Sequence, residues 1–118
     1  MIPFAIQLIA HGVGDFMLQN QWMADNKAKS NWVCAIHVLL YGLAFYLFTW
    51  GAISLAQMAA VVGTHFLIDR LRLAYRWRLM MNIDYPLEQG PINTFVIIAI
   101  DQVMHVATNY AIFITLND

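Results

Sequence analysis

The chain has 118 residues, of which 61% are hydrophobic and 11% are charged, and its formal net charge at pH 7 is -1. Soluble domains average about 45–50% apolar and about 25% charged residues. A soluble chain of this length has too little interior to bury so much apolar surface, so the composition indicates a membrane protein. The length allows one domain, which we expect to cover residues 1–118.

Membrane-spanning helices are predicted in four places along the chain. No Asp, Glu, Lys or Arg occurs between Lys29 and Asp69, a stretch about twice as long as the roughly 20 residues that cross a bilayer. Trp50 and Gly51 divide this stretch into two. The predicted spans are about 3–20, 31–50, 53–74 and 92–116. The sequence therefore predicts an all-α, polytopic membrane protein built as a bundle of four transmembrane helices.

All lysines and arginines lie between spans one and two or between spans three and four. By the positive-inside rule both basic loops are cytoplasmic, which leaves both termini outside. We expect membrane lipids as partners, with anionic head groups contacting the basic stretch after the third span. Its arginines are Arg70, Arg72, Arg76 and Arg78. Arginines beside a membrane meet anionic lipid first, so nucleic-acid binding is not expected.

Histidine and aspartate are paired at a spacing of four residues in three of the spans. The pairs are His11/Asp15, His65/Asp69 and, in reverse order, Asp101/His105. This spacing puts both side chains on one face of a helix. Spans one and three run towards the cytoplasm, whereas span four runs away from it. The reversed order in span four therefore keeps its aspartate nearer the cytoplasm, as in the other two pairs, with each histidine one helical turn deeper in the membrane. His37 lies alone in the second span.

Ionisable groups are costly inside a membrane, so this set predicts a buried site. Carboxylates and histidines that project inward from facing helices build metal sites in bundles. We expect one or two divalent ions, with zinc favoured and manganese or iron as alternatives. The predicted ligands are His11, Asp15, His65, Asp69 and His105.

Three further residues are assigned roles around this predicted metal site. Asp101 and His37 are expected as ligands or as the general base. Gln19 follows Asp15 by four residues and is expected to orient that carboxylate by a hydrogen bond. Cys34 is either a soft ligand or a small packing residue. The alternatives to a metal site are a structural polar core, a proton or ion path, or haem ligation.

The first motif also resembles a known family. Its elements are His11, Gly14-Asp15-Phe16, Gln19, Trp22-Met23-Ala24 and Asn26-Lys27, with looser matches at His37, His65 with Asp69, and Asp101-Gln102 with His105. The chain resembles the bacterial and phage membrane family called domain of unknown function family 3307. That family is similar to inner-membrane proteins described as metal-dependent hydrolases. The resemblance implies a bacterial inner-membrane protein and supports the metal more than any substrate.

The combined prediction is a membrane-embedded metal-dependent hydrolase with a cytoplasm-facing site, acting on a lipid, a phosphoester or an amide. The alternative is a non-enzymatic membrane protein, either an ion or proton carrier or a phage-type pore or interaction subunit. The outer halves of two spans, residues 39–48 and 108–116, contain no Asp, Glu, Lys, Arg or His. Access from one side only favours the enzyme. A homo-oligomer is compatible with either reading.

Overall fold

The computed structural model describes residues 2–81, 83 and 91–116, with side chains throughout except at residues 91–94. Over this part of the chain all regular structure is helical and no strand occurs, so the all-α prediction is confirmed. The elements are α1 (Phe4–Gly12), the π-helical turn η1 (Val13–Met17), α2 (Gln21–Asn26), α3 (Asn31–Phe48), α4 (Leu55–Arg70), α5 (Leu73–Met80) and α6 (Pro91–Thr115).

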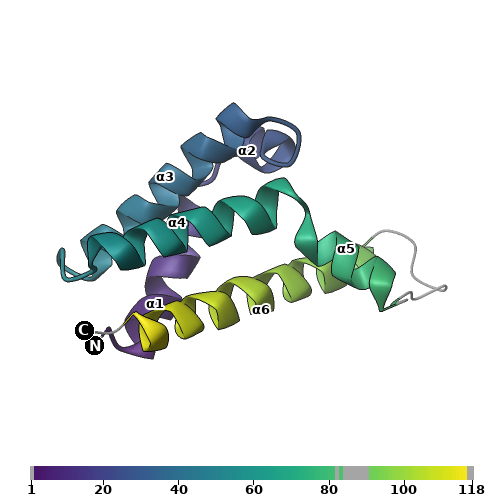
Figure 1. Ribbon diagram of the computed structural model, residues 1–118. Coiled ribbons are helices and arrows are strands. Elements are labelled where there is room, and N and C mark those ends of the chain that lie inside the picture. The colour runs from purple at the N-terminus through teal and green to yellow at the C-terminus, as the bar shows by residue number, and fades with distance from the viewer. Residues whose placement is uncertain (1, 82, 84–90, 117–118) are drawn as a thin grey trace.

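Helices α3 and α4 form an antiparallel hairpin (Figure 1). The turn between them includes Trp50 and Gly51, both with positive φ. Ser54 and Gln57 then form a capping box that satisfies free backbone N–H groups at the start of α4. A β-carbon at Gly42 would lie 2.8 Å from Val62 Cγ2. A glycine is therefore needed there for the two helices to approach this closely.

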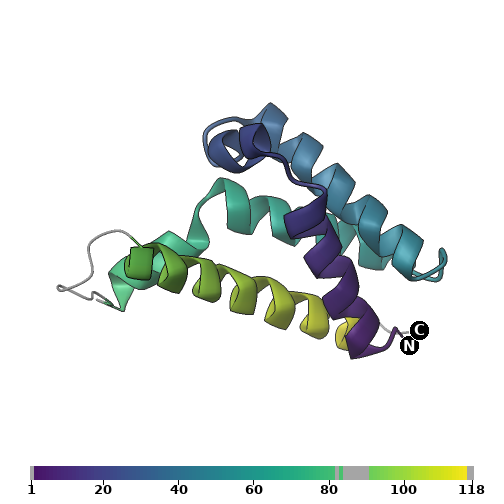
Figure 2. The same cartoon turned by 180° about the vertical axis from the view of Figure 1, so that it is seen from behind.

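Helix α6 lies beside α4, and α1 crosses the bundle obliquely (Figures 1 and 2). Gln57 donates from Nε2 to the backbone oxygen of Leu116 at 3.0 Å, which ties α4 to the end of α6. Phe4 of α1 packs edge-on against Tyr110 of α6. The start of α1, the end of α6 and the α3–α4 turn thus lie together at one end, which we call the hairpin end.

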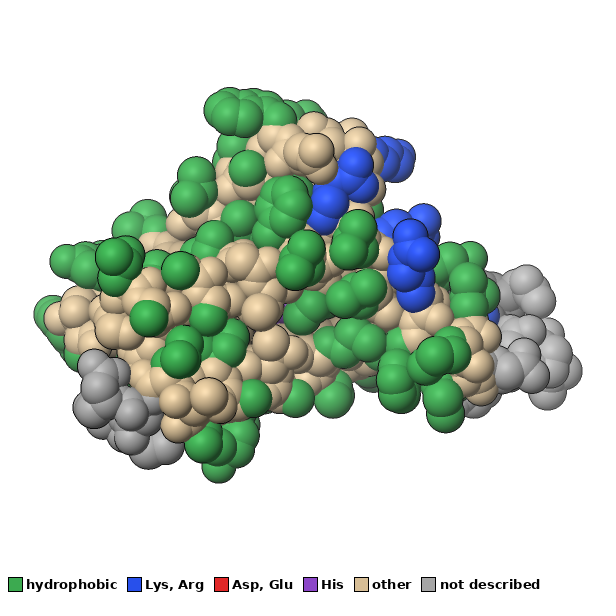
Figure 3. Space-filling model, in the orientation of Figure 1, with side chains coloured by type: hydrophobic (Ala, Val, Ile, Leu, Met, Phe, Trp, Pro, Cys, Tyr) green, Lys and Arg blue, Asp and Glu red, His purple; other side chains and the backbone are tan. Residues whose placement is uncertain are grey.

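The opposite end carries the basic residues and is called the basic end. Its members are Lys27, Lys29, Arg70, Arg72, Arg76 and Arg78. Arg70 links its two segments by donating to Asn31 Oδ1 at 2.7 Å and to the Ala28 backbone oxygen at 2.8 Å. Figure 3 shows lysine and arginine side chains gathered towards this end, with hydrophobic side chains over the rest of the same face.

Many polar side chains lie inside this bundle and many large apolar ones lie outside, which differs from the pattern of a soluble protein. Phe16, Leu39, Leu47, Leu55 and Val103 are all exposed. The buried polar residues are Gln7, His11, Asp15, His37, Thr49, Gln57, His65, Asp69, His105 and Asn109. Such an arrangement suits a hydrocarbon solvent around the bundle.

Two helices are long and apolar enough to cross a membrane, namely Asn31–Phe48 and the described part of α6, Phe95–Thr115. The apolar segment Phe4–Met17 is shorter. Helix α4 has 16 residues and ends at Arg70, because Arg72 adopts the left-handed conformation with φ 53°. The stretch predicted as a third span over 53–74 is therefore divided between α4 and α5. Neither of the short helices α2 and α5 was predicted.

Candidate metal centre

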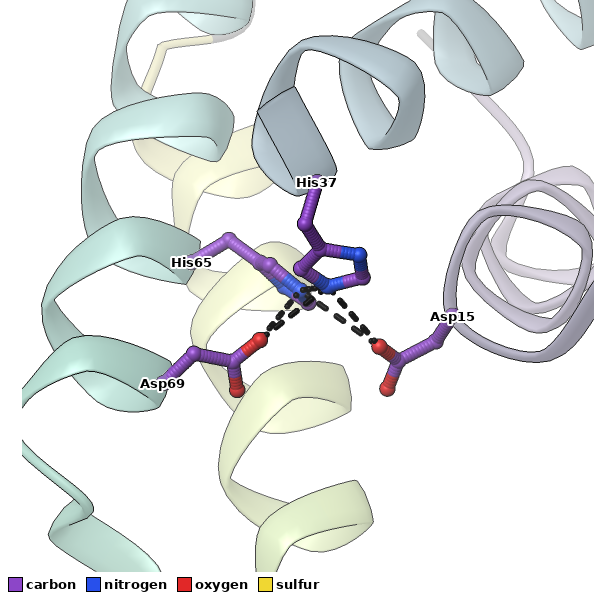
Figure 4. A group of neighbouring side chains, drawn as sticks. All are labelled: Asp15, His37, His65 and Asp69. Atoms are coloured by element: carbon purple, nitrogen blue, oxygen red, sulfur yellow. Dashed lines mark hydrogen bonds and ion pairs between the residues drawn. The ribbon is translucent and has the colours of Figure 1, made fainter. Parts of the chain in front are cut away.

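Four buried side chains from three parts of the chain face one another near the middle of the bundle (Figure 4). His37 comes from α3, His65 and Asp69 come from α4, and Asp15 comes from η1. Each side chain is at most 3% exposed. One ligand atom from each lies within 4.8 Å of all the others. We call this set the four-ligand group.

Five of the six separations among these four atoms are close to those of tetrahedral coordination, and the two carboxylate oxygens lie within 4.8 Å of each other. The Nε2 atoms of His37 and His65 are 3.0 Å apart. Asp69 Oδ2 lies 3.1 and 3.2 Å from these nitrogens, and Asp15 Oδ1 lies 3.3 and 3.5 Å from them. Bonds of about 2.0–2.1 Å from a tetrahedral zinc ion require ligand separations of about 3.3–3.4 Å. Nitrogen and carboxylate oxygen are also donors that zinc accepts, so the residues fit this ion.

The π-helical turn η1 places Asp15 in this group. Wider turns of this type are rare and occur mostly at functional sites. Gly14 permits the turn to approach α3, because a β-carbon there would lie 2.7 Å from Tyr41 Cδ2. The wider turn also changes the relation of Asp15 to His11, which a regular helix would place on one face. His11 Nε2 and Asp15 Oδ2 are 4.0 Å apart, and the side chain of Gln102 contacts both residues.

Aromatic stacking fixes the ring of His65. One face lies on Tyr41, with ring centroids 3.7 Å apart, and the other lies on His105, with centroids 4.0 Å apart. His105 also contacts Asp69, with its Nε2 3.0 Å from Oδ1. That contact leaves the second carboxylate oxygen, Oδ2, facing the two histidines. Ligand orientation by such outer contacts is typical of metal sites.

His105 belongs to a second set of possible ligands with Asp15 and Asp101. Its Nε2 lies 3.4 Å from Asp101 Oδ1, and the Asp101 side chain is 22% exposed. Asp15 is common to both sets, so a carboxylate can bridge two ions as well as bind one. The four-ligand group alone could hold one ion, and the two sets together could hold two, as expected from the sequence.

Four predicted metal-site residues, Asp15, His65, Asp69 and His105, thus lie in one set or the other, but His11 lies in neither. The role of His11 as a ligand stays a prediction, and both of its ring nitrogens contact other side chains. Nδ1 lies 2.6 Å from the Tyr41 hydroxyl, and Nε2 lies 2.6 Å from Gln102 Oε1. Asn109 Nδ2 donates to the same hydroxyl at 2.8 Å. His11 is therefore part of a hydrogen-bond network beside the four-ligand group.

Asp15 accepts a hydrogen bond from Gln102, and the orienting role of Gln19 stays a prediction. Gln19 Oε1 is buried with no hydrogen-bond partner in the described part of the chain. Gln102 instead donates from Nε2 to Asp15 Oδ2 at 3.1 Å. Gln19 lies beyond the end of η1, in a stretch without helix, whereas the four-residue spacing assumes one continuous helix. Of the two readings of Cys34, packing is supported, since its Sγ lies 3.8 Å from the Phe66 backbone oxygen.

Lys27 is a site residue that the metal-ligand argument did not identify. Its Nζ lies 3.0 Å from Asp69 Oδ2 and 3.9 Å from Asp15 Oδ1. Burial acts against the charged form, but the carboxylates of Asp69 and Asp15 outweigh it and raise the pKa of the ammonium above its ordinary value. With Asp101 included, three carboxylates face one ammonium when the histidines are neutral. The uncompensated charge equals that of one divalent cation.

Other missed residues carried a signal in the sequence. Tyr41 follows His37 by four residues and Asn109 follows His105 by four. The spacing that identified the His/Asp pairs would have placed both on the same faces. A tyrosine or an asparagine does not by itself indicate a metal site, but both are polar, and buried polar side chains need hydrogen-bond partners.

Comparison with curated proteins finds no match, and comparison with solved structures finds none either. A family model does match almost the whole chain, over residues 3–117. It covers every residue of the four-ligand group, and the predicted resemblance is confirmed. The chain belongs to the family described as protein of unknown function (DUF3307).

Proposed function

We propose that this protein is a membrane-embedded metal-binding protein that acts as a metal-dependent hydrolase. The metal is inferred from the four-ligand group, whose nitrogen–nitrogen and nitrogen–oxygen separations of 3.0–3.5 Å suit a tetrahedral ion. With the histidines neutral, the three carboxylates exceed Lys27 by two negative charges, and such charge in a water-poor interior requires compensation. Zinc is the ion that we favour, with manganese or iron as alternatives.

The membrane setting rests on the distribution of polar and apolar side chains. In this proposal α3 and α6 span the bilayer, and the shorter α1–η1 segment and α4 span it with local thinning of the lipid. The basic end faces the cytoplasm of a bacterial cell, in line with the positive-inside rule. Trp32 and Trp50 are 72% and 95% exposed at opposite ends of α3, as expected of interfacial anchors.

Hydrolysis is favoured because proton-accepting groups adjoin the metal centre. A bound zinc ion would lower the pKa of a coordinated water towards 7, which requires a fifth position for that water beside the four protein ligands. Asp101 is partly exposed and lies 3.4 Å from His105 Nε2, so its carboxylate can accept a proton at the edge of the site. His105 lies between Asp101 and Asp69 and positions both carboxylates. The substrate class is a lipid, a phosphoester or an amide.

A proton or ion carrier is the alternative, and the hydrogen-bond network running from Asp15 through Gln102 and His11 to Tyr41 is the observation in its favour. Beyond Asn109, however, the interior becomes apolar. Phe45, Val61 and Phe113 are fully buried there. A path across the membrane would have to pass through this layer, so one-sided chemistry is the better account.

Metal analysis of the full-length protein, purified in detergent without chelators, tests the metal part of the proposal. We expect about one equivalent of zinc, or two if the second set also binds. His37→Gln should lose the ion from the four-ligand group, whereas His11→Gln should retain it. X-ray absorption should show nitrogen and oxygen ligands at about 2.0 Å. Metal-free protein that is indifferent to added zinc would contradict the proposal.

Activity is tested separately with p-nitrophenyl phosphate and p-nitrophenyl butyrate as simple phosphoester and carboxylic ester substrates. Asp101→Asn should lower kcat while the metal content stays constant, because the amide cannot accept the proton. An unchanged kcat in this variant would remove Asp101 from the mechanism. A metal-loaded protein without turnover on any ester or amide would reduce the proposal to metal binding.

Orientation is tested by cysteine labelling in a Cys34→Ala background. Trp50→Cys reports the hairpin end and Lys29→Cys reports the basic end. An impermeant maleimide added to intact cells should label only the hairpin end. Labelling of only the basic end would place the site on the outer side instead.

A further inference from the structure

A pocket of about 250 Å³ opens beside the four-ligand group at the basic end. Asp69 and Asp101 line the side nearest the metal centre, and Lys27 and Arg72 contribute positive charge. Ile97 and Ile98 of α6 are among its apolar lining residues. The volume lies below the roughly 300–1,000 Å³ of pockets that enclose a whole drug-sized ligand. It suits a head group with the first atoms of a chain.

Arg72 is the arginine available to a ligand in this pocket. Within the described residues its guanidinium makes no hydrogen bond or ion pair, and it rests on the Tyr75 ring at 4.5 Å. Arg70 and Arg76, by contrast, already donate to protein oxygens. Arg72 also has φ 53°, a strained conformation for a residue with a β-carbon. Such strain is concentrated at functional and ligand-binding positions.

The pocket changes its charge when a metal binds. With neutral histidines and no ion, the carboxylates of Asp15, Asp69 and Asp101 outnumber the cations Lys27 and Arg72, so an anion is repelled. A divalent ion in the four-ligand group reverses this balance and leaves one net positive charge. Anion binding at this pocket should therefore depend on the metal.

We propose that this pocket binds the phosphate-type head group of an anionic amphiphile, with Arg72 and Lys27 contacting the phosphate and Ile97 and Ile98 contacting the chain. The inference rests on the proposed metal function and names its substrate class. Arg72 offers paired N–H donors that match phosphate oxygens. The apolar residues favour a phosphate ester carrying a hydrocarbon chain over free phosphate.

Calorimetry on the full-length, zinc-loaded and desalted protein in detergent tests this with three probes. They are dihexanoyl phosphatidic acid, dihexanoyl phosphatidylcholine and inorganic phosphate. We expect phosphatidic acid to bind at least about tenfold more tightly than either other probe, and at least about tenfold more tightly than to metal-free protein. Equal affinities for inorganic phosphate and phosphatidic acid would overturn the proposal that the ligand is an amphiphile. Equal affinities of metal-free and zinc-loaded protein for phosphatidic acid would overturn the proposed dependence on the metal.

Matched variants assign the binding to the pocket. Arg72→Gln should weaken phosphatidic acid binding at least about fivefold, and Arg72→Lys should restore part of it. Lys29→Gln removes the same charge from the basic end but does not line the pocket, so it should bind normally. Equal losses in Arg72→Gln and Lys29→Gln would overturn the inference. Zinc content is measured on the same samples. A variant that keeps its zinc but loses phosphatidic acid binding has lost the pocket, whereas one that loses its zinc has lost the metal centre.

Discussion

The two halves of the bundle interior differ sharply although the same helices build both. Towards the basic end the core consists of histidines and carboxylates. Towards the hairpin end its largest apolar side chains are Phe45, Val61 and Phe113, all fully buried, with the centroids of the two stacked phenylalanine rings 5.9 Å apart. The buried amides of Gln7 and Gln57 donate to backbone oxygens at that end. Tyr41 forms the boundary, since its hydroxyl contacts His11 while its ring packs 5.2 Å from Phe45.

This contrast explains how a small bundle can contain so many polar groups. The apolar half supplies packing that does not depend on an ion, and dispersion between closely packed side chains stabilises helices in lipid. The polar half depends on charge balance. Variants in the two halves should therefore separate bundle stability from metal binding.

The largest effect is expected for Asp69→Asn in the polar half. Asp69 contacts Lys27, His37, His65 and His105, and the amide loses the anionic ligand. Metal affinity measured by competition with a chelator should fall at least about a thousandfold, or about 4 kcal/mol. Asp25→Asn is the matched control, because Asp25 is exposed on α2 and contacts Gln21. Equal affinities in the two variants would remove Asp69 from the centre.

In the apolar half, Phe113→Ala should lower the stability of the bundle without changing zinc binding. Truncation leaves a cavity beside Phe45, and thermal or denaturant unfolding in detergent should show a loss of about 3 kcal/mol. Zinc stoichiometry of the folded fraction should stay constant. Loss of zinc from folded protein would show that the two halves are not independent.

Much of this division can be read from the sequence, because apolar composition and four-residue spacing are local properties. His65 and Asp69 lie in a regular stretch of α4, where that spacing places both at the centre. Asp15 lies in a π-helical turn and His11 in the helix before it, a change of helix type that residue spacing does not reveal. The contact of Lys27 with Asp69 joins residues 42 positions apart, so it depends on tertiary packing.

A smaller effect is expected for Gly14→Ala, which disturbs the π-helical turn η1 that holds Asp15 in the polar half. A β-carbon at Gly14 would lie 2.7 Å from Tyr41 Cδ2 and 3.1 Å from its Cα, whereas one at Gly12 meets nothing within 4 Å. Gly14→Ala should therefore lower stability by about 2 kcal/mol and weaken zinc binding by moving Asp15. Gly12→Ala should leave both unchanged. Matching melting temperatures and zinc affinities in these two variants would contradict the close approach.

The smallest effect, and the only gain, is expected for Lys27→Met. An ammonium 3.0 Å from Asp69 Oδ2 stabilises the metal-free protein but repels a cation bound to the same oxygen. Its removal should raise zinc affinity about tenfold, or about 1.4 kcal/mol, and lower the melting temperature of metal-free protein. The difference in melting temperature between zinc-loaded and metal-free samples should therefore increase. Lys29→Met controls for surface charge, and a zinc affinity that falls in Lys27→Met would mean that the ammonium supports the ion instead of replacing it.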